Sequence, residues 1–147
     1  MTRNPIANYA SCSLGALRIM TGLLFMQHGL QKYFQYPPGG HQQGAFTLFS
    51  LFGAAGTLEL FGGILIVLGL YTRPVAFLLA GEMAVAYWMI HFPAGLAMKA
   101  GIFPVVNGGD LAILFCFTFL HLVFAGSGAW SVGAVLNRTA VNGENAR

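Results

Sequence analysis

Residues 56–90 read GTLELFGGILIVLGLYTRPVAFLLAGEMAVAYWMI, in which two long apolar runs are joined by the short segment YTRP at 71–74. A helix that crosses a membrane needs roughly 20 mostly apolar residues, and each run approaches that length. Proline suits the first turn of a helix, and so short a connection forces the two helices to run antiparallel. The stretch therefore predicts a transmembrane helical hairpin.

The composition of the whole chain indicates the same class of protein. Of its 147 residues, 56% are apolar and 7% are charged, whereas an ordinary globular domain is about 25% charged. A soluble fold would lack the polar surface to cover so much apolar sequence, so we expect one integral membrane domain over residues 1–147, surrounded by the lipid bilayer. The seven Lys and Arg residues do not cluster, which argues against a nucleic-acid partner.

Four segments are apolar enough to span a membrane, and we expect an all-α fold in which they form an antiparallel four-helix bundle. They are residues 13–33, 54–71, 74–92 and 110–127. The first is expected to be a retained helix rather than a cleaved signal, because no small-residue cleavage site follows a short apolar run. Regularly spaced glycines and alanines would let the helices pack closely, within the chain or in a homo-oligomer.

The distribution of Lys and Arg predicts how the chain is oriented. Arg3, Arg73, Arg138 and Arg147 fall on one side of the predicted bundle, and Lys32 and Lys99 fall on the other. Because basic residues are enriched on the cytoplasmic side of membrane proteins, we expect both termini to lie in the cytoplasm.

Ionisable residues occur where they are energetically most costly. Three of the four acidic residues lie in or at the mouth of apolar runs, and so does Arg18. Charges in hydrocarbon usually face a bundle interior, pair with one another and mark a site. A rise of 1.5 Å per helical residue divides these groups into two layers. The layer nearer the termini contains Arg18, Glu82 and His121, and the other contains His28, Lys32, Glu59, His91 and Asp110.

In the layer nearer the termini, we predict a buried ion pair between Arg18 and Glu82. Neutralising two charges is worth most where the dielectric is low. Such a pair could be purely architectural or functional, and the sequence leaves both readings open. His121 is either a satisfied interior histidine or a proton or ligand contact.

The other layer is the predicted ligand or proton site, centred on Glu59. Its carboxylate could accept a proton, hold a cation or orient a polar headgroup, with His28, Lys32 and Asp110 beside it. Alternatively, Glu59 pairs with Lys32 or His28 only to hold the helices together. Glu82 and His91 fall on opposite sides of an ideal third helix, so we expect Glu82 to face the interior and His91 to be interfacial.

Other kinds of site are not indicated by the sequence. His28, His91 and His121 lie on three helices at different depths, so no metal site is expected. Cys12 and Cys116 are placed too far apart in depth to form a disulfide. No glycine-rich nucleotide loop follows a strand.

Several short motifs occur in a recognisable order along the chain. They are Arg18, Phe25, His28-Gly29 and Lys32; Glu59 and Gly62-Gly63; Gly69-Leu70-Tyr71-Thr72-Arg73; Glu82; His91-Phe92-Pro93; Asn107-Gly108-Gly109-Asp110; and Gly126-Ser127-Gly128 through Ser131. In these motifs, over about residues 13–136, the chain resembles the DoxX family of small four-helix membrane proteins. It departs from the family at Asp110, where Glu is usual, and at Gly133, where an acidic residue is frequent.

The resemblance implies a location in the bacterial cytoplasmic (inner) membrane and a link to redox metabolism. Members of the family resemble the small subunit of thiosulfate:quinone oxidoreductase, and others are tied to thiol and oxidative-stress systems. The first hypothesis is therefore a quinone-interacting subunit of a membrane oxidoreductase. Glu59 and His28 would handle protons, Trp88 or a Phe would line the ring pocket, and electrons would come from a membrane redox partner protein, since no intrinsic cofactor is expected.

Two further hypotheses remain open at this level. The chain could be a non-catalytic scaffold or assembly factor of a membrane redox complex. It could also be a small transporter in which Glu59 and Glu82 are successive proton or cation stations. Whether the protein is itself an enzyme is left open, because no self-contained catalytic or redox-cofactor motif is present.

Overall fold

The computed structural model describes residues 5–38, 49–97 and 102–136, and these ranges contain helices and no strand. The all-α prediction is therefore confirmed for the described residues. In chain order the elements are α1 (Pro5–Phe34), α2 (Leu51–Thr57), the π-helical η1 (Leu58–Gly62), α3 (Gly63–Leu68), α4 (Thr72–Ala86), the π-helical η2 (Tyr87–His91), α5 (Phe92–Ala97), α6 (Pro104–Asn107) and α7 (Asp110–Ala125).

Several of these elements join into longer apolar helices. Three of them, over residues 9–34, 51–68 and 72–97, are long and apolar enough to cross a membrane, and residues 110–125 form a shorter apolar helix. The first helix begins at Pro5, earlier than predicted, which agrees with the preference of proline for the first turn of a helix. The predicted spans therefore correspond to four helical segments with shifted ends.

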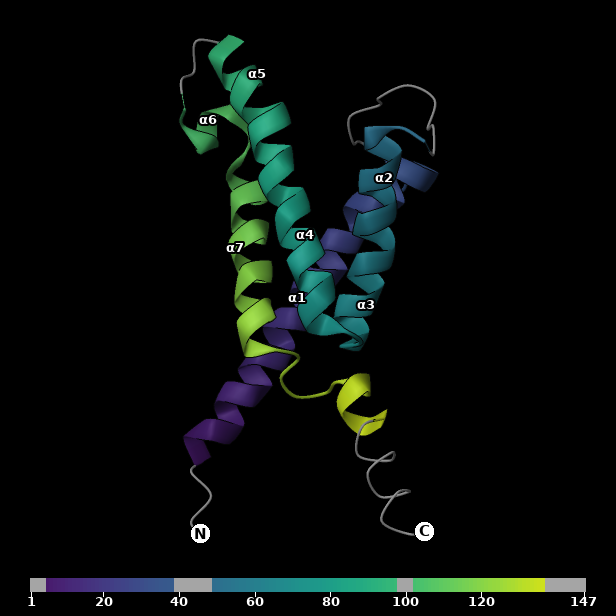
Figure 1. Ribbon diagram of the computed structural model, residues 1–147, viewed down its shortest axis with the longest axis vertical. Helices are drawn as coiled ribbons and strands as arrows, with labels where there is room; N and C mark the ends of the chain where they lie inside the picture. Colours follow the sequence, from purple (N-terminus) through teal and green to yellow (C-terminus); the bar gives the residue numbers. More distant parts are fainter. Residues whose placement is uncertain (1–4, 39–48, 98–101, 137–147) are drawn as a thin grey trace.

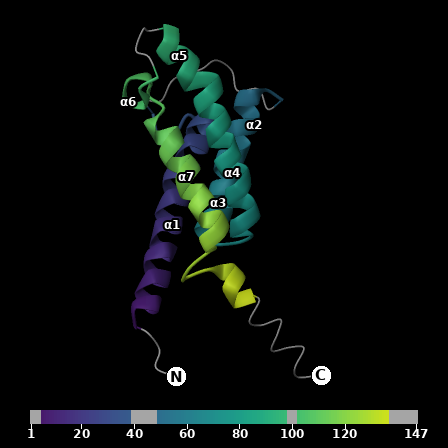
Figure 2. The ribbon, with the colours of Figure 1, turned by 60° about the vertical axis from the view of Figure 1, so that its left-hand side comes forward.

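The four segments run alternately up and down and pack as two close pairs (Figure 1). In one pair α1 lies along η1 and α3, and in the other α4 lies along α7. Figure 2 shows α4 and α7 side by side from a second direction. The start of α1 and the last described residues, 132–136, lie at the same end of the molecule, which we call the terminal end.

The predicted tight connection between the second and third spans is confirmed. Gly69 ends α3 in the left-handed conformation, with φ of 68°, which glycine adopts without strain. The backbone N–H groups of Gly69 and Leu70 donate to the carbonyls of Ile66 and Leu65. α4 then begins at Thr72, so that the proline at position 74 lies in its first turn, as predicted.

Glycines bring α1 into direct contact with η1 and α3. A Cβ added at Gly22 would lie 3.0 Å from the carbonyl oxygen of Gly63, and one added at Gly29 would lie 2.5 Å from the backbone nitrogen of Leu60. Side chains at these positions would push the helices apart. The close packing that the glycine spacing predicts is therefore present within the chain.

A cluster of aromatic rings joins the two helix pairs. The ring of Phe25, on α1, is fully buried and lies 5.2 Å from that of Phe115 and 4.8 Å from that of Phe119, both on α7. Edge-to-face contacts of this kind are favourable beyond the area that they bury. The same core contains Ile66 and Leu79, so all four segments contribute to it.

The third helix does not end at Phe92, as the sequence led us to predict. It continues through Pro93 to Ala97 because the turn before the proline widens into the π-helix η2. Proline has no N–H to donate and its ring clashes with the carbonyl of an ordinary preceding turn. A π-helical turn changes that spacing and also rotates the side chains beyond it.

Candidate functional site

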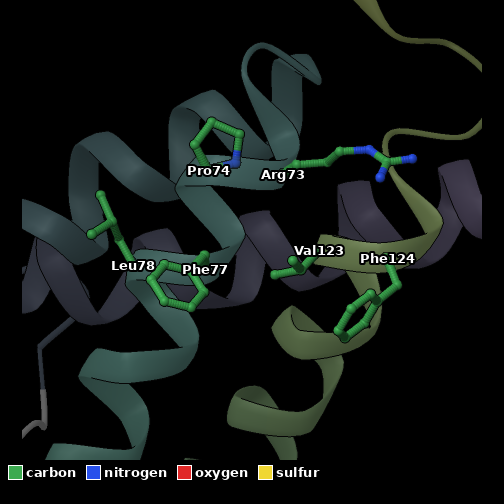
Figure 3. Close-up of a pocket in the computed structure, with 6 residues that line it drawn as sticks. All are labelled: Arg73, Pro74, Phe77, Leu78, Val123 and Phe124. Carbon is green, nitrogen blue, oxygen red and sulfur yellow. The ribbon is translucent and has the colours of Figure 1, made fainter.

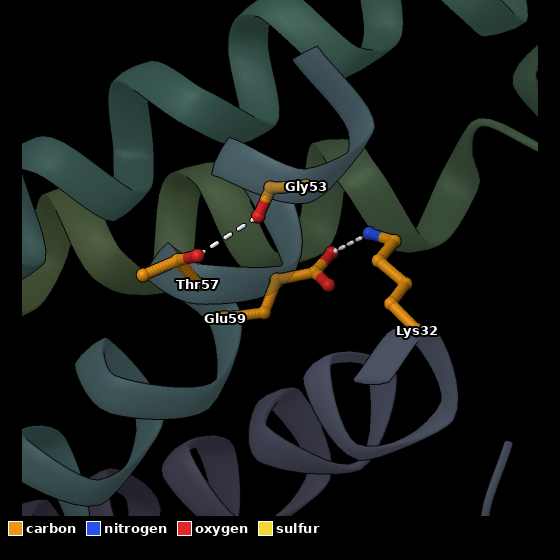
Figure 4. Close-up of polar contacts among 4 residues, drawn as sticks. All are labelled: Lys32, Gly53, Thr57 and Glu59. Carbon is orange, nitrogen blue, oxygen red and sulfur yellow. Dashed lines mark hydrogen bonds and ion pairs between the residues drawn. The ribbon is translucent and has the colours of Figure 1, made fainter. Parts of the chain in front are cut away.

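A buried ion pair joins α1 to the π-helical segment of the second span. The Nζ atom of Lys32 lies 2.5 Å from Oε1 of Glu59 (Figure 4). The Glu59 side chain is 5% exposed and that of Lys32 is 20% exposed, so water screens the pair only weakly. The Lys32 ammonium also lies 5.2 Å from the centre of the Phe52 ring, within the range of a cation–π contact.

Hydroxyl groups fix the helix next to this pair. The Oγ1 atom of Thr57 donates to the carbonyl of Gly53 at 2.9 Å, as Figure 4 shows, and lies 2.5 Å from the hydroxyl of Tyr33. Tyr33 follows Lys32 on α1, and Thr57 precedes Glu59 by two residues. A second polar contact, between Tyr33 and Thr57, therefore joins the same two helical segments next to the ion pair. Tyr33 and Thr57 are not among the predicted site residues, although they lie one and two positions from Lys32 and Glu59, which are.

Glu82, on α4, belongs to the same polar group. The charges that act on its carboxyl group are those of Glu59 and Lys32. Both carboxyl oxygens of Glu82 and the Oε2 atom of Glu59 are buried and have no hydrogen-bond partner among the residues that the structure describes. Lys32, Glu59 and Glu82 therefore form an interior group, which we call the Lys32 cluster, with unused hydrogen-bonding capacity.

The predicted ion pair between Arg18 and Glu82 is wrong. Arg18 is fully buried, and its guanidinium is satisfied by backbone carbonyls instead of a carboxylate. Nε donates to Ser127 at 2.7 Å, Nη1 to Ile66 and Val67 at 2.6 and 2.5 Å, and Nη2 to Ala129 and Trp130 at 3.2 and 3.1 Å. The carbonyls at a helix C-terminus carry partial negative charge, so the end of α3 and the segment after α7 take the place of a counter-ion.

The segment that follows α7 is held against α1 and α3 by further bonds. The N–H of Ala129 donates to the carbonyl of Ser11 at 2.9 Å, and the hydroxyl of Ser131 donates to the carbonyl of Gly69 at 3.0 Å. A Cβ added at Gly15 would lie 2.6 Å from the Ala129 carbonyl oxygen. Arg18 therefore has an architectural role, because it joins three parts of the chain at the terminal end.

His28 lies on the α7 side of α1 and lines a small cavity. Its ring meets that of Phe115 edge to face, with centres 6.1 Å apart. The cavity, which we call the His28 cavity, has a volume of about 200 Å³ and is lined by Leu24, Gln27, His28, Gln31, Leu111 and Phe115. It combines apolar walls with three polar side chains of α1, a combination typical of ligand sites. Lys32 lies one helical turn beyond His28.

The structure does not bring His91 or Asp110 into contact with Glu59. The Nδ1 atom of His91 lies 3.2 Å from the carbonyl oxygen of Asn107, so His91 contacts the connection before α7. Asp110 begins α7 and is exposed, and it makes no ion pair with any residue in the described ranges. The predicted five-residue site is thus divided: Lys32 and Glu59 pair, His28 lines the neighbouring cavity, and His91 and Asp110 lie apart from the pair.

Two residues expected in the interior lie on the outside. Trp88 is 62% exposed and packs on the rings of Tyr87 and Phe92 at the surface. His121 is also exposed, because the buried face of α7 consists of Ala112, Phe115, Phe119 and Leu122. The prediction of interior contacts for Trp88 and His121 was therefore wrong. Over the described ranges no three His, Cys, Asp or Glu side chains could hold a metal ion together.

A comparison with protein families gives the chain its place among known proteins. The family model of DoxX matches residues 13–92, which include most of α1, the Lys32 cluster and α4. The chain belongs to the DoxX family. This confirms the resemblance inferred from the order of its motifs.

Three proteins similar to this chain differ in what their names say. An uncharacterised protein of Haemophilus influenzae is 38% identical over 130 residues, which cover 86% of this chain and 92% of the relative. An uncharacterised membrane protein of Mycobacterium tuberculosis is 27% identical and covers 87% of this chain and 83% of its own length. A Bacillus subtilis protein, CatD, named provisionally as an oxidoreductase, is 29% identical over 76% of this chain and 77% of its own. No solved structure matches the chain at a significant level.

Proposed function

We propose that this DoxX-family membrane protein binds a quinone and acts as the quinone-interacting or accessory subunit of a membrane redox system. The observation that supports this most directly is the His28 cavity, where His28, Gln27 and Gln31 edge a space with apolar walls. A quinone headgroup is a flat apolar ring with carbonyl oxygens that accept hydrogen bonds. The imidazole and the two amides are suited to donate to those oxygens.

The dimensions of the cavity fit a headgroup better than a whole quinone. Drug-sized ligands occupy pockets of about 300–1,000 Å³, and the His28 cavity has about 200 Å³. Leu24 and Leu111, at its edge, are exposed on the surface of α1 and α7. In this proposal the ring enters the cavity beside Phe115, and the isoprenoid tail stays in the lipid.

The Lys32 cluster would supply protons to that headgroup. Reduction of a quinone to a quinol consumes an electron pair and one proton for each carbonyl oxygen. Lys32 lies one turn from His28 and is paired with Glu59, which in turn interacts with Glu82. Unpaired carboxylates are costly in hydrocarbon, so Glu82 is suited to carry a proton between turnovers. The electrons would come from a partner redox protein, and the name of the Bacillus subtilis relative supports such a setting.

The proposal includes the placement of the chain in the membrane. The four antiparallel segments would form a bundle across the bacterial inner membrane, with the terminal end in the cytoplasm. The first turn of α4, with Arg73, lies at the terminal end, and Lys32 lies near the other end of α1. Four basic residues are predicted on the terminal side and two on the other, and this bias in positive charge supports that orientation.

A ligand-dependent melting experiment tests the quinone site. Addition of short-chain ubiquinone or menaquinone analogues to the purified protein should raise its melting temperature, because a ligand that binds only the folded state stabilises it. His28→Leu should abolish the shift, whereas the matched control His121→Leu, at an exposed position on α7, should retain it. The absence of a shift with both analogues would reject the proposal.

The same buried carboxyl groups favour one alternative. Three carboxyl oxygens of Glu59 and Glu82 lack a partner in the described part of the chain, and such groups also occur along proton pathways of transporters. Proton flux into proteoliposomes would distinguish the two functions. A transporter should lose its flux in both Glu59→Gln and Glu82→Gln, whereas a quinone-binding subunit should show no flux that depends on these residues.

A further inference from the structure

An apolar groove lies on the outer face of the helix pair α4 and α7, at the terminal end. It has a volume of about 560 Å³ and is lined by Arg73, Pro74, Phe77, Leu78, Val123 and Phe124. In Figure 3 the side chains of Phe77 and Val123 lie between the two helices, while the side chain of Arg73 runs toward the end of α7. Phe77, Leu78 and Phe124 are 65%, 57% and 73% exposed, so nothing in the described chain covers them.

Within the ranges that the structure describes, the cation at the mouth of this groove has no counter-ion. Arg73 is exposed and makes no hydrogen bond or ion pair through its guanidinium with the described residues. Its Nε and Nη2 atoms lie 3.5 Å from the position of a Cβ added at Gly126, so the guanidinium rests against the end of α7.

The acidic residues of the described ranges are engaged or remote. Glu59 and Glu82 belong to the Lys32 cluster. Asp110 begins the helix beside whose last turn Arg73 lies, about 24 Å away at 1.5 Å per residue. No acidic side chain of the described ranges is therefore placed to neutralise Arg73, which leaves its guanidinium open to an anion from outside these ranges.

We infer that this groove binds an anionic phospholipid, with an acyl chain between α4 and α7 and the phosphate against Arg73. An exposed apolar groove in a membrane-spanning helix pair is in contact with lipid chains, and a cation at the helix end is at headgroup depth. Arginine presents a planar fork of N–H donors that matches the oxygens of a phosphate. The apolar groove thus matches the acyl chain of a phospholipid, and Arg73 matches its phosphate.

The site is independent of the proposed quinone site. It lies on the α4–α7 face at the terminal end, whereas the His28 cavity is lined by residues of α1 and by Leu111 and Phe115 of α7. A lipid in the groove would bridge the ends of α4 and α7 and so stabilise that helix pair. Failure of one proposal would leave the other unaffected.

The experiment is a lipid titration of the full-length protein in detergent, read by native mass spectrometry. Phosphatidylglycerol and phosphatidylcholine with identical acyl chains are compared, so that only the headgroup differs. The wild-type protein should bind phosphatidylglycerol about fivefold more tightly, the factor that one cation contributes near an anionic headgroup. Arg73→Gln should remove this preference, and Arg73→Lys should retain most of it.

A second pair of variants tests the apolar half of the site. Phe77→Ala, in the groove, should weaken the binding of both lipids, whereas Phe117→Ala, at an equally exposed position on α7 outside the groove, should not. Equal binding of the two lipids by the wild-type protein, or a preference that persists in Arg73→Gln, would overturn the proposal. A dimer that dissociates in Phe77→Ala without any lipid preference would assign the groove to a second copy of the chain and likewise reject the lipid.

Discussion

Gly29 of α1 lies directly against the backbone of Leu60, the residue that follows Glu59. A Cβ added at Gly29 would lie 2.5 Å from the Leu60 nitrogen and 2.8 Å from its Cα. Lys32 lies one turn beyond Gly29, so the close approach of α1 to η1 sets the separation between its ammonium and the Glu59 carboxylate. Backbone packing and the buried ion pair are therefore parts of one arrangement.

This relationship predicts that Gly29→Ala destabilises the protein and disturbs the ion pair. The added methyl group meets backbone atoms that cannot rotate away, and overpacking of this kind costs about 1–3 kcal/mol. The free energy of unfolding in detergent measures the effect. Gly81→Ala is the matched control, because nothing lies within 4 Å of a Cβ there. It should be neutral or slightly stabilising, since alanine favours a helix, and equal losses in both variants would contradict the argument.

A second prediction concerns the ion pair itself. Lys32→Met leaves the Glu59 carboxylate buried without a counter-ion and should cost about 3 kcal/mol, at the low end for broken buried pairs because Lys32 is partly exposed. Adding Glu59→Gln to Lys32→Met should recover much of the loss. Unfolding free energies of the two single variants and the double variant measure the coupling. Strictly additive losses would show that the pair is not stabilising.

A third prediction addresses the guanidinium of Arg18. Arg18→Met leaves backbone carbonyls buried without donors and should cost about 4 kcal/mol or more, an exceptionally large effect for one residue. Arg18→Lys should restore little of this stability, because an ammonium cannot reproduce the planar fork of the guanidinium, which reaches the end of α3 and the segment after α7 together. Thermal unfolding measures both variants. A stable Arg18→Lys protein would contradict this account of the site.

A fourth prediction separates Glu82 from Arg18. The carboxyl oxygens of Glu82 have no partner in the described ranges, so Glu82→Gln should leave stability unchanged or increase it. A double-mutant cycle with Arg18→Met should give a coupling energy below about 0.5 kcal/mol, as for independent sites. Strong coupling would instead support the ion pair between Arg18 and Glu82 that the sequence predicted.

The same variant also tests the proposed function. Proton-dependent quinone reduction in a reconstituted system should be slower in Glu82→Gln than in the wild-type protein, even though the variant is stable.

Some parts of the fold could be read directly from local sequence. The segment YTRP at 71–74 predicted the tight antiparallel connection, and the structure has Gly69 in a left-handed conformation before it. The motif Asn107-Gly108-Gly109 is likewise a local turn, in which the Asn107 side chain accepts a hydrogen bond from the N–H of Gly109 at 2.9 Å. These features depend on residues close together in the chain.

The polar interior was only partly predictable. The contact of Lys32 with Glu59 was one of two alternatives for the same layer, and the structure contains it. Depth at 1.5 Å per residue nevertheless paired Arg18 with Glu82, and the structure does not contain that pair. The depth estimate compares side chains only, whereas the partners of Arg18 are backbone carbonyls. A charged residue can be recognised in the sequence, but an unpaired backbone carbonyl at a helix end cannot.

The sequence by itself determined that this is a helical membrane protein with a hairpin at residues 71–74 and costly charges in its apolar runs, because length, hydropathy and turn chemistry are local properties. Only the tertiary structure decided which charges meet. The π-helices η1 and η2 shift the phase of the side chains, glycine contacts set how closely α1 approaches η1, and the end of α3 meets the segment after α7 around Arg18. Those outcomes depend on the packing of distant segments, which periodicity along one helix does not contain.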